Sequence, residues 1–196
     1  MDFTEVVRRR RMVRNYTSQP VETDVVERIV DAGRRAPSAG FSQGAYLVVV
    51  TQEATRTALA QIANEDEYAA QGFDRWISNA PVHLVVCISE ADYHRRYTEP
   101  DKLADDGTET PWPVPYWWVD AGATLMSLLL ATVNEGLAAG FFGVYRLGGI
   151  EEVLGIPETV TPIGVVTIGH PAPDRPSSSL TRGRRPRSEV VRWERW

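Results

Sequence analysis

Cysteine and lysine are almost absent from this 196-residue chain, which has one of each, Cys87 and Lys102. A single thiol excludes an internal disulfide framework and a Cys-x-x-Cys metal or redox pair. The leucine-rich stretch 125–130, like every other apolar stretch of the sequence, is far shorter than the roughly 20 residues that cross a bilayer. The opening residues, Met-Asp-Phe-Thr-Glu, lack the apolar segment of a secretion signal. We therefore expect a cytoplasmic protein with no membrane partner. The length of the chain predicts one domain over 1–196.

The 20 arginines are concentrated at the two ends of the chain. Five lie between positions 8 and 14 and six between 182 and 195, whereas most acidic residues lie in the middle. Because the net charge is −5, the chain as a whole is not expected to bind nucleic acid. Two explanations remain for the basic ends: they are ordinary solvated surface, or they meet at one bound anion.

Motifs of several enzyme classes are missing. No Gly-x-Gly-x-x-Gly follows a strand, and the chain has no P-loop and no His-Glu-x-x-His, which argues against a Rossmann domain, an NTPase and a zinc protease. The pentapeptide 40–44 matches the Gly-x-Ser-x-Gly of serine hydrolases. A predicted helix precedes it and a predicted strand follows, the reverse of the order that a nucleophile elbow needs. We expect neither a serine nucleophile nor a metal site.

Hydrophobic periodicity and turn residues divide the chain into helices and strands. Asp2 is placed to cap a first helix, with Glu5 in the reciprocal position, and Thr23 or Asp24 to cap a second. Further helices are expected at 53–63, 65–79, 117–139 and 150–154, and strands at 45–51, 82–89, 141–146 and 162–168. Residues 90–115 show no regular pattern and are expected to form a lid or a binding loop.

Two features of the sequence indicate a dimer. The predicted helix 117–139 is apolar around most of its surface, as are helices buried centrally or in an interface. The tail 171–196 is too rich in Pro, Ser and Arg to form a core, yet it could extend on the order of 85 Å. We expect a homodimer in which each tail wraps the partner subunit. The alternative is a monomer whose tail folds back on itself.

Four sets of residues, in this order, resemble the FMN-dependent nitroreductase family. They are Arg-Arg-Met-Val-Arg-Asn-Tyr at 10–16, Ala-Pro-Ser-Ala-Gly-Phe-Ser-Gln at 36–43, the glycine-containing segments 140–145, 154–158 and 163–171, and Arg-Gly-Arg-Arg-Pro at 182–186. The resemblance covers nearly the whole chain. It implies an α+β fold with a mixed, mainly antiparallel sheet flanked by helices. It also implies a domain-swapped C-terminal arm and an obligate dimer with two FMN sites at its interface.

The same resemblance implies which residues bind the flavin. The family's residues that bind the phosphate and the ribityl chain correspond to Arg10, Arg11, Met12 and Arg14 of the first basic segment and to Arg182 and Arg184 of the tail. The loop contributed by the other subunit corresponds to Pro37, Ser38 and Ala39, followed by Phe41 and Gln43. The backbone beside the flavin ring corresponds to Arg146, Leu147 and Gly148. Because a guanidinium binds phosphate through two parallel hydrogen bonds, both basic ends are expected to converge on one phosphate.

Two positions depart from the family's pattern. Met12 stands where the family has a serine, which removes one hydroxyl contact. Phe41 stands where the family has an asparagine that hydrogen-bonds the polar edge of the flavin ring, and phenylalanine cannot make that bond. An unpaired buried polar group costs about 1–3 kcal/mol. Either Gln43 or a water takes the place of the asparagine, or the flavin is held more weakly, or a different redox partner is used.

The function implied is transfer of a hydride from NADH or NADPH, through FMN, to a small acceptor such as a nitroaromatic, a quinone or an enone, in ping-pong order. Because the flavin carries the chemistry, no side chain is assigned as a nucleophile or general base. Residues that offer stacking or charged faces to a substrate are Tyr93, His94, Arg95, Trp112, Tyr116 and Trp117. Packing in the dimer interface is the alternative role for the aromatic residues among them.

Two hypotheses of other classes stay open. Phe41 motivates the first, in which the protein binds and sequesters FMN or the deazaflavin F420 without turnover. In the second, the arginine-rich ends bind nucleic acid, which predicts an RNA affinity that falls steeply with salt. The acidic middle of the chain argues against this second hypothesis.

Overall fold

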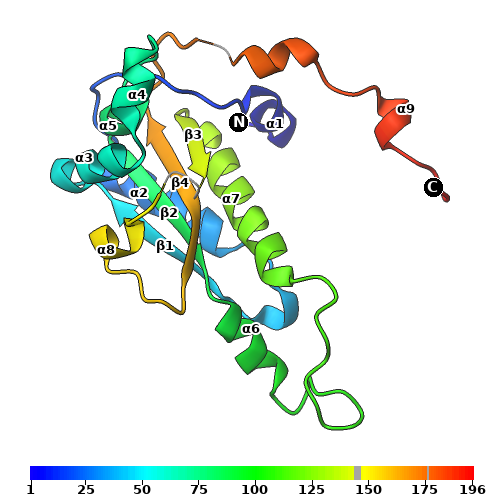
Figure 1. Ribbon diagram of the computed structural model, residues 1–196. Helices are drawn as coiled ribbons and strands as arrows, with labels where there is room; N and C mark the ends of the chain where they lie inside the picture. The colour runs from blue at the N-terminus through cyan, green and yellow to red at the C-terminus, as the bar shows by residue number, and fades with distance from the viewer. Residues whose placement is uncertain (144–146, 176) are drawn as a thin grey trace.

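A computed structural model describes residues 1–143, 147–175 and 177–196 (Figure 1). Their strands form one sheet in the order β1-β2-β4-β3, with β1 at Ala45–Val50, β2 at Val82–Ile88, β3 at Ala138–Gly143 and β4 at Thr161–Gly169. Each neighbouring pair of these strands is antiparallel. The predicted α+β fold with a mainly antiparallel sheet is confirmed.

The two central strands are covered on both faces. Val85 of β2 pairs with Val48 of β1 on one side and with Val165 of β4 on the other. All residues of β2 are buried. Because both of its faces meet helices, β2 is a nearly continuous apolar run instead of an alternation of apolar and polar residues.

Helices α2 (Thr23–Arg34) and α7 (Tyr116–Asn134) cover one face of the sheet (Figure 1). Ile29 of α2 and Leu128 of α7 are fully buried. They belong to one apolar cluster with Leu84 of β2. Burial of side chains of this size stabilises a fold by about 1.5–3 kcal/mol each, so this layer fixes α7 against the sheet.

The opposite face carries α3 (Glu53–Ile62), α4 (Glu65–Ala70), α5 (Trp76–Asn79) and α8 (Ile150–Leu154). Leu59 and Ile77 pack in a second apolar cluster with Val85 of β2. The buried carboxylate of Glu65 accepts hydrogen bonds from the N–H of Ile77 at 2.5 Å and of Ser78 at 3.1 Å. These bonds satisfy free N–H groups in the first turn of α5 and so fix this short helix in place.

The N-terminal helix α1 (Phe3–Arg9) begins as predicted, because Asp2 Oδ1 accepts a hydrogen bond from the N–H of Glu5 at 3.0 Å. The reciprocal half of the predicted capping arrangement is not formed. The side chain of Glu5 pairs with Arg8 and Arg9 instead. These pairs lie on the surface, where they contribute little to stability.

The C-terminal arm, 171–196, leaves the sheet after β4 and carries η3 (Ser178–Arg182) and α9 (Arg187–Val190). Figure 1 shows the arm, in orange and red, passing α1 and extending away from the sheet. Most described residues of the arm are exposed, Trp193 and Trp196 at 79% and 103%, although the side chain of Asp174 near its start is buried. The prediction that the tail forms no core of its own is confirmed, whereas its exchange between subunits stays a prediction.

The segment 90–115 is not irregular throughout, because α6 (Glu90–Tyr97) occupies its first part. Ser89 Oγ accepts a hydrogen bond from the N–H of Asp92 at 3.3 Å and caps this helix. The prediction of a loop was wrong here for a physical reason. α6 is rich in charged residues and buries only two side chains, so its sequence lacks the apolar periodicity of most surface helices.

The predicted helix 117–139 ends earlier than expected, at Asn134. Gly136 follows with a φ of +79°, and the N–H of Leu137 bonds to a carbonyl of the last helical turn. A glycine in this conformation is a common helix end, so β3 begins at Ala138, three residues earlier than predicted.

Two smaller predictions were also wrong. The helix expected over 65–79 is two helices, α4 and α5, separated by a turn around Gly72. At the start of α2, neither Thr23 nor Asp24 is the cap. Glu22 occupies that position and its side chain makes no capping bond, so α2 depends on tertiary packing for its start.

Helix α7 has the length and mean hydropathy, 19 residues and 1.2, of a membrane span. This is weak as an indication of a membrane, because the core helix of a globular protein has the same properties. Leu128 and Leu129 on its inner face are buried against the sheet. Trp118, Val119 and Met126 on its outer face are 45%, 51% and 45% exposed, so α7 presents an apolar surface outward.

Candidate functional site

A cavity of about 440 Å³ lies between β3, α4 and α5, where the C-terminal arm leaves the sheet. Its volume is within the range of small-molecule sites. Its lining residues come from separate stretches of the chain: Arg14, Tyr68, Phe73, Asp74, Trp76, Phe141, Phe142, Gly143, Asp174, Arg175, Ser177 and Ser178. The cavity is therefore assembled by the fold and not by one local motif.

Aromatic rings form much of the cavity wall. Trp76 packs edge-on against Phe142, with 5.6 Å between ring centroids, and Tyr68 packs edge-on against Phe73 at 6.3 Å. Trp76 and Phe142 are buried, whereas Phe73 is partly exposed. Aromatic faces of this kind stack on planar rings, so the wall suits a flat ligand.

Arg14 brings positive charge to this cavity. Its guanidinium carbon lies 5.8 Å from the centroid of the Trp76 ring, a cation–π distance. Within the described part of the chain, this guanidinium makes no ion pair with a carboxylate. Arg175 lies in the same way over Phe73, at 5.4 Å, and two serines of the arm complete this side of the cavity. Cations and hydroxyls beside an aromatic wall suit a ring that carries an anionic group.

Asp174 also lines the cavity, but its carboxylate faces the backbone. Its side chain is only 4% exposed. Oδ2 accepts a hydrogen bond from the backbone N–H of Arg14 at 3.0 Å and lies 3.7 Å from Arg11 Nη1. Asp174 thus ties the start of the arm to the N-terminal segment and leaves the guanidinium of Arg14 available to a ligand.

The N-terminal segment reaches the cavity because residue 140 is a glycine. The N–H of Val13 donates to the carbonyl of Ala139 at 2.9 Å. A Cβ on Gly140 would lie 2.5 Å from the Val13 carbonyl oxygen and 2.8 Å from the ring of Trp76. At these distances a side chain at position 140 would displace a neighbour, and a shift of the Val13 backbone would move the adjoining Arg14 as well.

Tyr16 fastens the same segment on its other side. Its hydroxyl is buried, donates to the carbonyl of Val13 at 3.0 Å and lies 2.8 Å from Thr167 Oγ1 of β4. Burial raises the pKa of this phenol above its ordinary value. Tyr16 therefore stays neutral and acts as a fixed support next to Arg14.

The predicted flavin loop, 37–43, lies elsewhere in the molecule. The short turn η1 (Ala39–Phe41) forms its centre, and Gly40, Phe41 and Gln43 have positive φ values. Phe41 at its tip is 74% exposed. None of the residues 37–43 lines the cavity.

The loop and the cavity lie toward opposite ends of the molecule. The loop is bonded to Arg96 of α6 and to Asp120 in the first part of α7. Figure 1 shows α6 at the opposite end of the sheet from α4 and α5, which flank the cavity. One chain therefore does not bring this loop to its own cavity, whereas a second copy of the chain could.

The predicted substrate residues lie beside the loop. Five of the six form one aromatic cluster: Tyr93, His94, Trp112, Tyr116 and Trp117. The ring centroids of Trp112 and Trp117 lie 5.6 Å apart. Arg95 lies outside the cluster, where it pairs with Asp92.

Hydrogen bonds hold this aromatic cluster together. Glu109 accepts from Trp112 Nε1 at 2.6 Å, and this bond holds the pKa of the carboxyl below its ordinary value. His94 Nδ1 lies 2.7 Å from the same carboxylate, which raises the pKa of His94. Tyr93 is fully buried, and its hydroxyl donates to Asp120 at 2.8 Å. Burial, and to a smaller extent this hydrogen bond, raises the pKa of the Tyr93 hydroxyl. Trp117 Nε1 is buried without a partner among the described residues.

The other predicted flavin contacts are dispersed. Met12 pairs with Ala139 and packs on the apolar layer beneath α7. Leu147 is buried and Gly148 is exposed, just before α8, while Arg146 lies outside the described residues. On the arm, Arg182 and Arg184 are exposed and make no ion pair with a described residue.

Five basic residues are predicted to bind the phosphate end of the flavin: Arg10, Arg11, Arg14, Arg182 and Arg184. Of these, only Arg14 lines the cavity. The expected convergence of both basic ends on one phosphate is therefore not formed within a single chain and stays a prediction for the dimer.

Sequence reasoning missed most of the cavity wall. Trp76 lies in the four-residue helix α5, and Phe142 lies in a strand where an aromatic residue is ordinary. Trp76 belongs to none of the motifs, and Phe142 lies in the segment 140–145 but was not assigned a role as a ring contact. Arg175 is the exception, because it extends the basic character of the C-terminal end and that signal was available in the sequence.

Comparison with known proteins identifies a family. The model of the Nitroreductase family matches residues 7–170. The chain is 30% identical over 177 residues to a Methanothermobacter thermautotrophicus protein named for NADH dehydrogenase and NAD(P)H nitroreductase activity, with 88% of this chain and 78% of that protein covered. It is also 30% identical over 170 residues to the FMN reductase [NAD(P)H] of Bacillus subtilis, with 83% of this chain and 63% of that protein covered.

A solved structure shows a similar fold. It is the NADPH:FMN oxidoreductase from Vibrio harveyi complexed with NAD+, which is 28% identical to this chain with a TM-score of 0.72. The superposition covers 99% of this chain and 77% of the Vibrio protein.

Proposed function

This chain belongs to the nitroreductase family, and on that premise we propose that it is an FMN-dependent oxidoreductase that uses NADH or NADPH as hydride donor. The proposed second substrate is a small planar acceptor such as a nitroaromatic or a quinone. Donor and acceptor would occupy the same cavity in turn, which is ping-pong behaviour. A cytoplasmic location belongs to the same proposal.

The residues around the cavity fit one half of an FMN site. The wall of Trp76 and Phe142 suits the flat ring system, and the guanidinium of Arg14 suits the phosphate. An arginine without an acidic partner among the described residues, set in an aromatic cavity, is the observation that carries the proposal. Bound FMN would supply the two-electron chemistry.

The chain's own residues would bind, orient and shield the cofactor. Arg14 would hold the phosphate by charge-assisted bonds, each worth about 1.5–3 kcal/mol. Trp76 and Phe142 would exclude water from one face of the ring. We keep Arg10, Arg11, Met12, Leu147 and Gly148 as further contacts, because they lie on the segments that adjoin Arg14 and the end of β3.

We further propose that the enzyme is a homodimer in which each subunit completes the other's site. The loop and the cavity are too far apart to act within one chain (Figure 1). Trp118, Val119 and Met126 form an exposed apolar face on α7 that a second copy would cover. The exposed arm, with Arg182 and Arg184, would then lie along the partner subunit.

In such a dimer the aromatic cluster beside the loop would lie near the mouth of the partner's cavity. We therefore keep the six residues Tyr93, His94, Arg95, Trp112, Tyr116 and Trp117 as proposed substrate contacts. Tyr93 is fully buried, so its part would be to support the exposed rings around it.

A second candidate function rests on Phe41. Its exposed apolar side chain cannot hydrogen-bond the polar edge of a flavin. A protein that binds FMN or F420 without turnover would fit this feature. Rapid anaerobic mixing with NADH and with NADPH separates the two functions, because only the enzyme bleaches its flavin.

The proposed function is tested on the purified, full-length protein. We expect a yellow protein with one FMN per subunit and a dimeric mass in solution. NADH or NADPH should bleach the flavin, and a quinone should restore its colour. A colourless protein that takes up no added FMN would contradict the proposal.

A further inference from the structure

The loop 37–43 has an unusual backbone. Gly40, Phe41 and Gln43 have φ values of +61°, +59° and +52°. For residues other than glycine this left-handed conformation costs about 1–2 kcal/mol each. Such a conformation persists only where the surrounding structure holds it, and it is frequent at functional sites.

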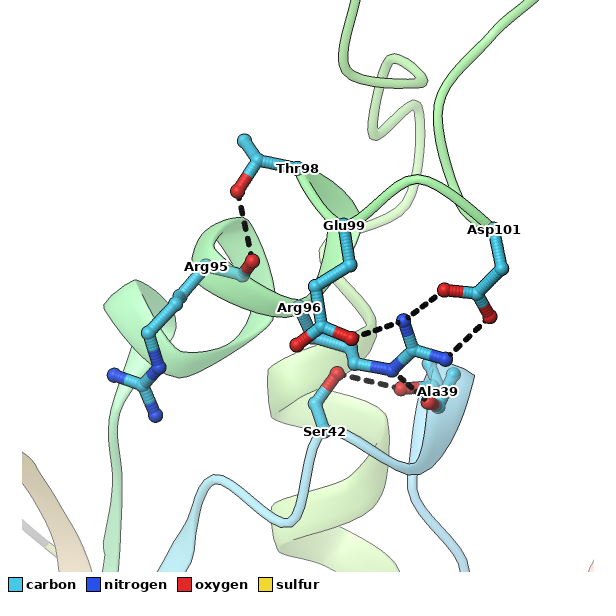
Figure 2. Close-up of polar contacts among 8 residues, drawn as sticks. Ala39, Ser42, Arg95, Arg96, Thr98, Glu99 and Asp101 are labelled. Atoms are coloured by element: carbon cyan, nitrogen blue, oxygen red, sulfur yellow. Dashed lines mark hydrogen bonds and ion pairs between the residues drawn. The ribbon is translucent and has the colours of Figure 1, made fainter.

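Arg96 of α6 holds the loop through its backbone. Its Nε donates to the carbonyl of Gly40 at 2.9 Å. Its two terminal nitrogens donate to the carboxylate of Asp101, both at 2.7 Å, and one of them also donates to Glu99 at 2.8 Å. Figure 2 shows the guanidinium between these acids and the loop that carries Ala39 and Ser42. The two acids therefore fix the orientation in which Arg96 meets the loop.

Two further contacts complete the support of the loop. The N–H of Ala39 donates to Asp120 at 2.8 Å, so α7 holds the loop one residue before α6 does. The ring of Tyr97 lies under Gly40, where a Cβ would come within 2.6 Å of it. Tyr97 in turn stacks on Trp112 with 4.3 Å between ring centroids. The tip of the loop, Phe41, is left exposed on a fixed base.

We propose that Arg96 is a positioning residue that fixes the loop 37–43 in the form in which it completes the flavin cavity of the partner subunit. This inference rests on the proposed function and adds a residue that touches neither cofactor nor substrate. A loop already held in its bound conformation loses less entropy on binding. Loss of Arg96 should therefore weaken FMN binding while the cavity itself is unchanged.

The test compares Arg96→Ala with Arg28→Ala in the full-length protein. Arg28 is a matched control, because it also holds two carboxylates, those of Asp24 and Glu135, but makes no bond to the loop. Three quantities are measured: the FMN dissociation constant, the hydrogen exchange of the 38–44 amides without FMN, and the melting temperature.

We expect Arg96→Ala to raise the FMN dissociation constant about tenfold, which is the scale of one charge-assisted hydrogen bond. Exchange of the amides 38–44 should become faster, while the melting temperature should match that of Arg28→Ala. Arg96→Lys keeps the charge but cannot bond Gly40 and Asp101 in the same geometry, so it should restore the affinity only in part.

FMN affinity and loop exchange within twofold of wild type in Arg96→Ala would overturn the inference, as would an equal loss in Arg28→Ala. Should Arg96→Ala not fold, Asp101→Asn must show the same two changes at smaller size, or the inference is wrong. Failure of the wild-type protein to take up FMN is a separate outcome, because it contradicts the proposed function itself.

Discussion

The two ends of the molecule contribute to the candidate site in opposite ways. At the cavity end, the surface consists of side chains, and Arg14 has no carboxylate partner among the described residues. At the loop end, the backbone of 37–43 is held by Arg96 and Asp120, and the exposed group is the apolar Phe41. The cavity end therefore leaves the charge of Arg14 available, and the loop end fixes the backbone conformation of 37–43.

This difference shows that different parts of one chain can determine the affinity for a ligand and the conformation of a loop. A cation can stay unpaired at the cavity because packed rings, not ion pairs, hold the walls there. The loop retains a backbone with positive φ values because the Gly40 carbonyl and the Ala39 N–H are bonded to neighbouring helices and Ser38 Oγ accepts from the Gln43 N–H. Substitutions at the cavity end should change ligand affinity alone, whereas removal of the buried Asp120 at the loop end should change stability as well.

The largest effect is expected at the loop end, from Asp120→Ala. This buried carboxylate accepts hydrogen bonds from the Tyr93 hydroxyl and the Ala39 N–H, both at 2.8 Å. Its removal leaves two buried donors unpaired, at about 1–3 kcal/mol each. We expect a loss of about 3 kcal/mol in the free energy of unfolding in urea. Asp120→Asn, which keeps one acceptor oxygen, should lose about half as much, and an unchanged stability would mean that the loop is not held by α7.

At the cavity end, Arg14→Ala should change affinity instead. Loss of its charge-assisted bonds should weaken FMN binding by about 1.5–3 kcal/mol, or roughly 10- to 100-fold. The free energy of unfolding of the FMN-free protein should change by less than about 0.5 kcal/mol. Fluorescence titration with FMN measures the first quantity and urea unfolding the second. Arg8→Ala, which removes a more exposed charge from α1, should change neither.

Two glycines allow a smaller test of the loop. Gly40 and Gly107 both have positive φ, but only Gly40 lies against a neighbouring ring, that of Tyr97. Gly107→Ala should therefore cost only the backbone strain, about 1–2 kcal/mol. Gly40→Ala should cost more than this and also weaken FMN binding. Equal losses of stability in the two variants would show that the close contact between Gly40 and Tyr97 does not affect the free energy of unfolding.

The smallest effect is expected from pH, in two windows of opposite sign. The pKa of His94 is raised by Glu109, so this pairing stabilises the fold below the ordinary value of 6.5 and is lost as the pH rises through the raised value. The pKa of Asp101 is lowered to about 2, chiefly by its bond to Arg96, so that pairing acts above the ordinary value of 3.8 and is lost as the pH falls toward 2.

His94 is exposed enough that we expect a change of at most about 0.5 kcal/mol between pH 5.5 and pH 9. Urea unfolding at both pH values measures it, and His94→Gln should remove it. If the variant keeps the same pH dependence as wild type, another group is responsible. The bond between Arg96 and Gly40 should persist across this whole range.

Much of the fold could be predicted from the sequence, because buried strands are short runs of β-branched residues. Val82–Ile88 is such a run, and it forms the centre of the sheet. Helix ends were harder to predict. The sequence is compatible with Gly136 inside a helix or just beyond its end, and only its positive φ shows that the helix has ended. Helix α6 was missed because its few buried residues give no apolar period. Its capping residue, Ser89, was the one available signal.

The candidate site was predictable only where it depends on charge. The cluster around Arg14 is visible in the sequence, and Arg14 does line the cavity. The wall of Trp76 and Phe142 was not predictable, because it forms only when α5 packs against β3. Nor could the role of Arg96 be inferred, since its bond to Gly40 joins residues 56 positions apart.

Gly140 has a consequence for how this protein can change. The position of Arg14 depends on a place in β3 where no side chain is present, between the Val13 carbonyl and the Trp76 ring. A single methyl group there would shift Arg14, the residue proposed to bind the phosphate, without removing any of the proposed ligand contacts. Natural variation at position 140 should therefore be restricted as severely as variation at Arg14 itself, even though a residue at 140 would never touch the ligand.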